Sequence, residues 1–206
     1  MVFLPFLQGI GLGASMIIPI GAQNSFILNQ AVKRNYHLQA ASICVACEIV
    51  LVALGIFGGG QLISANDWLH TLITWGGIVF LAGYGGLSFK AALTTQTVDQ
   101  QQAAKSKSLK AVVATALAVT LLNPHVYLDT VVILGSVGSQ FVGDDKIAFT
   151  LGIILASILW FYSLSLAAAR MSEILNRPRV RKGIDLAVGT IMWLIAASLC
   201  YAWVNG

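Results

Sequence analysis

Long runs of apolar residues, separated by short polar connections, dominate the chain. Six runs match or exceed the roughly 20 residues that a helix needs to cross a hydrocarbon core about 30 Å thick. They cover residues 2–28, 38–63, 68–89, 109–135, 147–169 and 184–204. A transmembrane β-barrel would show short segments of alternating polarity instead. The pattern predicts an all-α integral membrane protein with six transmembrane helices, in one domain that spans residues 1–206.

Basic residues concentrate in alternate connections between these runs. The first, third and fifth connections hold nearly all of them: Lys33, Arg34, Lys90, Lys105, Lys107, Lys110, Arg170, Arg177, Arg179, Arg181 and Lys182. The fourth holds only Lys146, beside two aspartates, and the second holds none. Lysine and arginine are enriched in cytoplasmic connections. The charge pattern therefore predicts that the odd connections face the cytoplasm and that both termini face the outside.

The composition excludes an ordinary soluble domain. The chain is 57% hydrophobic and only 10% charged, and its mean hydropathy is +0.82. The net charge of +4 does not indicate a nucleic-acid partner, because the basic residues lie in loops between apolar runs. The apolar N-terminus has no basic segment before it and no clear cleavage site, so it reads as a first spanning helix and not as a removed signal peptide.

Two of the apolar runs contain a proline in similar surroundings. Residues 18–25 read Ile-Pro-Ile-Gly-Ala-Gln-Asn-Ser, and residues 123–130 read Asn-Pro-His-Val-Tyr-Leu-Asp-Thr. In each, the proline should break the helix, and a polar side chain, Asn24 or Asp129, follows five residues later. With three spans in each half, the second half enters the membrane from the opposite side.

This pattern predicts two inverted three-helix repeats with Pro-broken helices 1 and 4. The first repeat covers about 1–92 and the second about 109–206, with a cytoplasmic loop at about 93–108. Matched breaks in inverted repeats are the sequence feature that best indicates a transporter's binding site. Asn24 and Asp129 would then be pseudo-equivalent groups on one pathway, with Pro19, Gly21 and Pro124 as hinges.

Glu48 and Asp129 are the acidic residues that lie well inside apolar runs. Glu48 lies about ten residues into its run, and hence about 15 Å deep. Charged groups inside a membrane are costly, and they mark functional sites by default. Burial favours the protonated form of a carboxylate, so both groups are expected to bind substrate and protons. The alternative is a packing carboxylic acid that stays protonated.

The other polar groups near the breaks each allow two interpretations. Gln23, Asn24 and Asn123 could bind substrate or cap backbone groups that the breaks leave free. His125 could relay protons or hydrogen-bond a carbonyl that Pro124 releases. Tyr127 could close over a ligand, although packing is favoured.

No enzyme chemistry is expected. Cys44 and Cys47 have the spacing of a redox pair, but they lie mid-helix without a proline or basic neighbour to activate a thiol. No set of His, Cys, Asp and Glu has the spacing of a metal site, and no nucleophile has a positioned base. The sequence thus predicts a protein without metal or cofactor.

Three stretches together resemble the lysine exporter (LysE-type) family, and within it the arginine exporter branch. They are Pro19-Ile-Gly-Ala-Gln-Asn-Ser-Phe-Ile-Leu-Asn-Gln, Trp75-Gly-Gly and Leu122-Asn-Pro-His-Val-Tyr-Leu-Asp-Thr. The resemblance covers nearly the whole chain. The family's first motif usually reads Gly-Pro-Gln-Asn, whereas Ala22 replaces that second proline here.

The resemblance implies a bacterial inner-membrane exporter of L-arginine and related basic amino acids such as lysine. It places Glu48 at a position that is usually acidic, and Asp129 at the acidic end of the Asn-Pro motif. No nucleotide-binding motif is present, so we expect export in exchange for protons. The rival interpretations are an exporter of neutral amino acids such as threonine or homoserine, a transmembrane thiol carrier and an ion channel. Glycine-rich helix faces permit a homodimer.

Overall fold

The computed structural model describes residues 2–19, 21–58, 67–94, 108–175 and 177–205. Every regular element within these ranges is helical. In chain order they are α1 (Phe3–Ile17), α2 (Ala22–Val32), α3 (His37–Ile56), α5 (Asp67–Thr94), α6 (Leu109–Leu121), α7 (Pro124–Tyr127), the π-helix η1 (Leu128–Ile133), α8 (Leu134–Gly138), α9 (Gly143–Arg170), α10 (Ser172–Leu175) and α11 (Pro178–Asn205).

Several of these helices are long and apolar enough to cross a membrane. Among the described residues, four single helical segments meet this condition: His37–Ile56, Thr74–Leu93, Gly143–Arg170 and Pro178–Tyr201. The helices α1 and α2 meet it together, with a bend of 76° between them. Leu109–Leu121 is apolar but shorter. These segments confirm a helical, multi-pass membrane protein, while the total of six spans stays a prediction.

The long helices are apolar on the outside as well as in the core. On α9, Leu151, Leu159 and Leu166 are exposed, whereas Phe149 and Ile153 are fully buried. A soluble protein rarely exposes apolar faces of this extent. A lipid-facing helix does, because the hydrocarbon solvates its side chains while the helix satisfies its own backbone groups.

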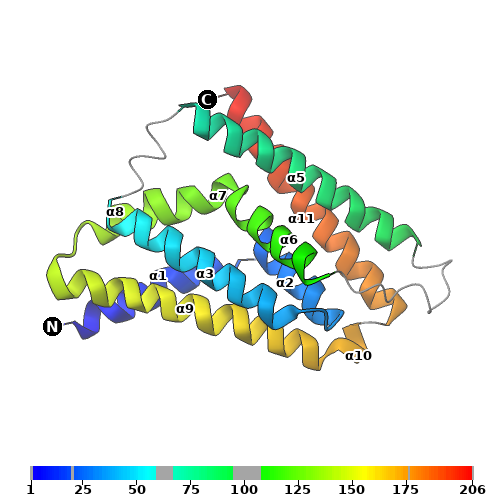
Figure 1. Ribbon diagram of the computed structural model, residues 1–206, viewed down its shortest axis with the longest axis horizontal. Helices are drawn as coiled ribbons and strands as arrows, with labels where there is room; N and C mark the ends of the chain where they lie inside the picture. The colour runs from blue at the N-terminus through cyan, green and yellow to red at the C-terminus, as the bar shows by residue number, and fades with distance from the viewer. Residues whose placement is uncertain (1, 20, 59–66, 95–107, 176, 206) are drawn as a thin grey trace.

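The long helices form two groups that lie on opposite sides of the molecule (Figure 1). α5 and α11 pack along each other on one side, and α9 packs on both α1 and α3 on the other. The chain α6–α7–η1–α8 runs between these groups and contacts α3. This arrangement leaves the two helix breaks facing each other in the middle of the molecule.

Glycines bring α1 and α9 into backbone contact. A Cβ atom on Gly9 would collide with the carbonyl oxygen of Phe149, and one on Gly152 would collide with that of Phe6. Close backbone approach through small residues is a main source of helix association in lipid. Gly9 and Gly152 therefore let α9 pack directly against the backbone of α1.

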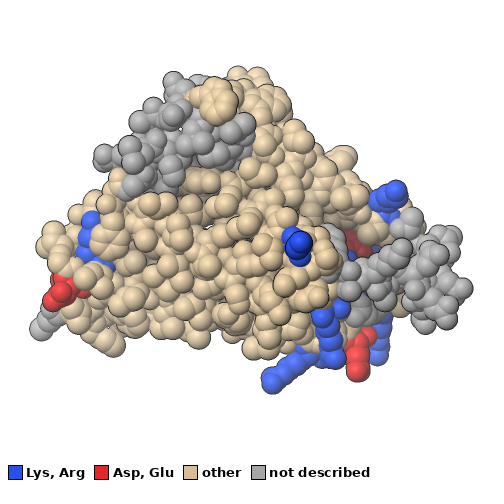
Figure 2. Space-filling view, viewed as in Figure 1, with Lys and Arg blue, Asp and Glu red and all other residues tan. Residues whose placement is uncertain are grey.

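Charged side chains are segregated between the two ends of the helix bundle. Most of the Lys and Arg side chains in view gather where α9 ends and α10 and α11 begin (Figure 2). We call this the basic end. The opposite end, where α9 begins, carries Lys146 together with Asp144 and Asp145.

Helix boundaries differ from the predicted spans mainly at their polar ends. α11 begins at Pro178, six residues before the apolar run, and α9 begins at Gly143. Proline suits the first position of a helix, and aspartates stabilise a first turn through the helix dipole, so both helices begin before their apolar runs. α3 ends at Ile56, and residues 59–63 of the predicted second span lie outside the described residues, as does most of the 93–108 loop.

Candidate functional site

The first helix break lies between Ile17, where α1 ends, and Ala22, where α2 begins. The Asn24 side chain closes it: its Nδ2 atom donates hydrogen bonds to the carbonyl oxygens of Ile17 at 2.7 Å and of Pro19 at 2.8 Å. These are carbonyls that an unbroken helix would have satisfied. The capping interpretation of Asn24 thus holds in the structure.

Trp160 of α9 fixes the remaining polar atom of the Asn24 side chain. Its indole nitrogen donates to Asn24 Oδ1 over 3.1 Å. Asn24 is only 5% exposed, and a buried amide needs partners for both its oxygen and its nitrogen. These three hydrogen bonds connect the first helix break to α9, and Asn24 thereby stabilises the structure of the site.

At the second break, a different side chain donates a hydrogen bond to a backbone carbonyl that the break leaves free. α6 ends at Leu121, and Pro124 occupies the first position of α7. The hydroxyl of Tyr127 donates to the Leu121 carbonyl at 2.8 Å. Tyr127 is half-buried, and it acts as a cap, a role that neither of its predicted interpretations included. The side chain of His125 lies outside the described residues, so both of its interpretations stay open.

Asp129 lies in a π-helical turn. The backbone N–H of Leu134 donates to the Asp129 carbonyl, five residues back along the chain. π-helical turns are rare and occur frequently at functional sites, because the wider turn changes the direction of its side chains. Thr130 follows with its hydroxyl bonded to the Val126 carbonyl at 2.7 Å.

A cavity of about 470 Å³ lies between the two breaks. Its volume falls within the ~300–1,000 Å³ of typical small-molecule sites. The walls come from the end of α1, the first break, α3, the α7–η1–α8 segment and α11. Its polar and charged lining residues are Ser15, Gln23, Asn24, Glu48, Asn123, Asp129 and Thr130. Pro19 and Gly21 also line it.

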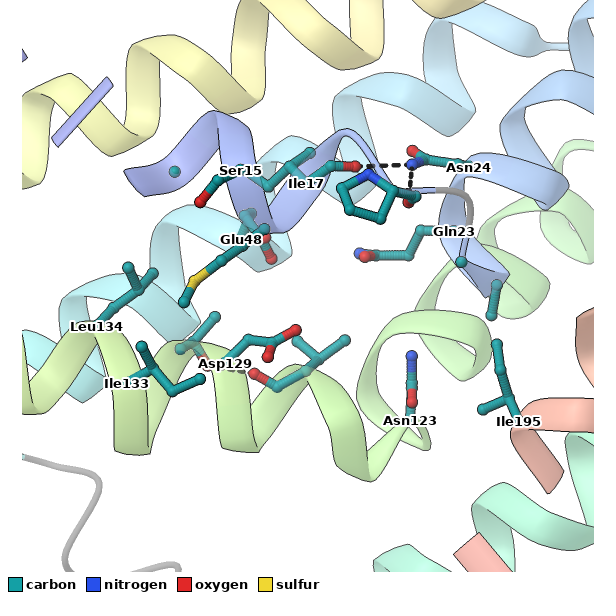
Figure 3. A pocket seen from close by; sticks show the side chains of 17 residues that line it. Ser15, Ile17, Gln23, Asn24, Glu48, Asn123, Asp129, Ile133, Leu134 and Ile195 are labelled. Atoms are coloured by element: carbon teal, nitrogen blue, oxygen red, sulfur yellow. Dashed lines mark hydrogen bonds between the residues drawn. The ribbon is translucent and has the colours of Figure 1, made fainter. Parts of the chain in front are cut away.

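The cavity therefore brings together most of the side chains that the sequence singled out. Glu48 of α3 and Asp129 of η1 line it from different elements (Figure 3). Glu48 is 6% exposed, and its Oε2 atom has no hydrogen-bond partner among the described residues. The two carboxyl groups lie close enough to act on each other electrostatically. An unsatisfied buried carboxyl oxygen beside a second acid favours a proton or a cationic ligand.

Gln23 connects the two breaks across the cavity. Its Nε2 atom donates to the Thr120 hydroxyl of α6 at 3.0 Å. Thr120 is fully buried and comes one residue before α6 ends. Gln23 and Asn123 both border the cavity (Figure 3). This bond links the start of α2 to the end of α6.

Residues of the site that the sequence did not single out include Ser15 and Ile195 in the cavity wall, and Trp160 behind Asn24. Only Trp160 offered a signal, because a buried indole N–H usually needs an acceptor. Ser15 and Ile195 have no pattern that sets them apart from other residues in apolar helices. Cys44 and Cys47 are free thiols on successive turns of α3, and Cys44 is fully buried.

The bent and interrupted helices, with a polar cavity between them, define a multi-pass membrane protein built like a transporter. Residues 14–202 match the family model described as LysE type translocator. The chain belongs to this family. The resemblance drawn from the motifs is thereby confirmed.

Named relatives cover nearly the whole chain. A protein of Pectobacterium carotovorum subsp. carotovorum (strain PC1) named arginine exporter protein ArgO is 46% identical, over 98% of this chain and 99% of its own length. The arginine exporter protein ArgO of Escherichia coli (strain K12) is 44% identical, over 96% and 93%. A protein of Aeromonas salmonicida named putative amino-acid transporter YggA is 47% identical, over 96% of each. No solved structure matches the chain.

The bonds of Asn24 generate a prediction about stability. Asn24→Ala leaves the carbonyls of Ile17 and Pro19 and the indole of Trp160 without their partner, and each buried unsatisfied group costs roughly 1–3 kcal/mol. We expect a lower unfolding temperature in detergent micelles. Ser25→Ala is the matched control, because the Ser25 hydroxyl is buried without a partner among the described residues. Equal unfolding temperatures for both variants would contradict the capping role.

Proposed function

We propose that this chain exports L-arginine, and related cationic amino acids such as lysine, from the cytoplasm in exchange for protons. The observation that carries the proposal is the cavity that Glu48 and Asp129 share at the level of the two helix breaks. The relatives named arginine exporters supply the substrate class. A cationic substrate matches a membrane-depth site whose ionisable groups are both acids.

The substrate would bind with its two ends at different walls. Carboxylates bind guanidinium groups through paired, charge-assisted hydrogen bonds, which assigns the side chain to Glu48 and Asp129. The α-carboxylate would bind at the start of α2, where Gly21 and Ala22 line the cavity. A helix N-terminus offers free N–H groups and a positive dipole end to an anion. The first turn of α2 contains no acidic residue that would compete.

Proton exchange follows from the energetics of moving a cation outward. The membrane potential, negative inside, opposes the export of one positive charge by about 2.3 kcal/mol per 100 mV. Exchange of one arginine for one proton moves no net charge. Glu48 and Asp129 would alternate between the proton and the substrate cation, since protonation removes the charge that holds the guanidinium.

The inverted six-helix repeat is also part of the proposal. Reciprocal packing supports it: α1 and α2 of the first half contact α9 of the second, while α6, η1 and α8 of the second half contact α3 of the first. The remaining pair, α5 and α11, contact each other. Exchanging the halves reproduces these contacts. Alternating access would rock one half against the other.

We also propose that the protein lies in the bacterial inner membrane, with its basic end facing the cytoplasm and both termini outside. Fusions of a fluorescent protein that matures only in the cytoplasm test this. Fusions at residue 1 and at residue 206 should both be dark, and an insertion after residue 100 should fluoresce. A fluorescent N-terminal fusion would contradict this orientation, and termini that differ in fluorescence would contradict the six-helix inverted repeat.

The proposed chemistry predicts the loss of export on neutralising either acid. Glu48→Gln and Asp129→Asn should each lower arginine flux by about tenfold or more, because a hydrogen bond to a charged group is worth roughly 1.5–3 kcal/mol. The measurement is efflux of labelled arginine from proteoliposomes with an imposed pH gradient. Asp144→Asn, an exposed acid at the first turn of α9, is the matched control.

The same assay separates the rival functions. Normal flux in both cavity variants, at equal protein content in the membrane, would remove the two acids from the mechanism. Competition by unlabelled threonine but not by lysine would favour an exporter of neutral amino acids.

A further inference from the structure

A third acid, Asp185, is buried on α11. It is 3% exposed, although it lies only two residues inside the last apolar run of the sequence. Positions 185, 188, 192 and 195 lie on one face of a helix, at alternating spacings of three and four. Ile195 of this face lines the cavity. Asp185 thus lies about 15 Å from Ile195 along the helix axis, toward the basic end.

Basic groups from both halves of the chain surround Asp185. Arg181 lies one turn earlier on α11, at the spacing that brings two side chains together on a helix. Lys33 directly follows α2, which contacts α11. Both cations lie close enough to act on the Asp185 carboxyl group electrostatically. From α5, the hydroxyl of Tyr84 is also within the range of its charge.

A packed apolar layer separates Asp185 from the cavity. Val188 and Met192 of α11 belong to the same core cluster as Ala22 and Phe26 of α2, and all four are at most 2% exposed. In the cavity wall, by contrast, Ser15 and Ile133 are exposed. The structure is therefore closed toward the basic end, and α2 and α11 are the helices that meet there.

We propose that Asp185 is a gate residue, which joins α11 of the second half to Lys33 beside α2 of the first and so holds the basic end closed. For the cavity to open toward the basic end, the pairing of Asp185 with Lys33 must break, and Phe26 and Met192 must move apart. The transport direction assigned to this gate rests on the proposed export function. The pairing itself does not, because the packing of α2 on α11 and the burial of Asp185 support it.

Cys44 supplies a reporter for the gate. It is 0% exposed and lies in the same core cluster as Phe26 and Met192. In a Cys47→Ser/Cys200→Ser background it is the single thiol of the chain. Its rate of modification by a charged methanethiosulfonate reagent, added to inside-out vesicles, measures access from the basic end without any transport substrate.

Asp185→Asn should speed the modification of Cys44 on the order of tenfold, the size of a typical coupling between two conformational states. Lys33→Gln should have a similar effect. The Cys44 rate in the Asp185→Asn/Lys33→Gln double variant should be close to that of either single variant, because the effects of two residues that act through one interaction do not add. Arg179→Gln, an exposed basic residue on α11, is the matched control and should leave the rate unchanged.

Three results would overturn the gate. An unchanged Cys44 rate in Asp185→Asn would remove its role, and full additivity with Lys33→Gln would remove the pairing. The third is an equal rise in the reactivity of Cys200, tested as the single thiol near the other end of α11, since this would indicate general loosening of the fold. None of these results depends on arginine flux, so a failed gate and a failed export function are distinguishable.

Discussion

A backbone carbonyl inside a membrane must have a hydrogen-bond donor, and the architecture of this protein depends on how it meets that requirement at two helix breaks. Asn24 donates to both Ile17 and Pro19 across the first break, and Tyr127 donates to Leu121 across the second. With these donors in place, the chain can stay interrupted at membrane depth. The interruptions open a cavity where continuous helices would pack against each other.

In the proposed mechanism, the cavity gives a role to two acids that would otherwise only destabilise the fold. Glu48 and Asp129 line the same space, and a single buried carboxylate without a partner is already costly. A guanidinium cation or a proton relieves this cost, so the site is expected to be occupied by one or the other in turn. The bond between Gln23 and Thr120 joins the two breaks beside this cavity.

Much of the site could be predicted from the sequence because several of its residue types are unusual within apolar segments. Prolines and carboxylates are rare in spanning helices, so Pro19, Glu48 and Asp129 were identified, and topology placed them together. The hydrogen-bond partners of the polar side chains at the breaks could not be predicted. Asn24 and Asp129 match in sequence position and both line the cavity, yet the Asn24 amide is committed to the backbone carbonyls of its own break. The π-helical turn and the burial of Asp185 depend on packing between distant helices, which no local pattern records.

The most direct test of the account is whether arginine and protons exchange at the same carboxyl groups. Arginine is added to purified protein in weakly buffered detergent solution, and the released protons are measured with a pH indicator while binding is measured by calorimetry. The account predicts proton release on arginine binding in the wild type, and its loss in the Glu48→Gln/Asp129→Asn double variant. Arginine binding to the wild type without proton release would contradict it.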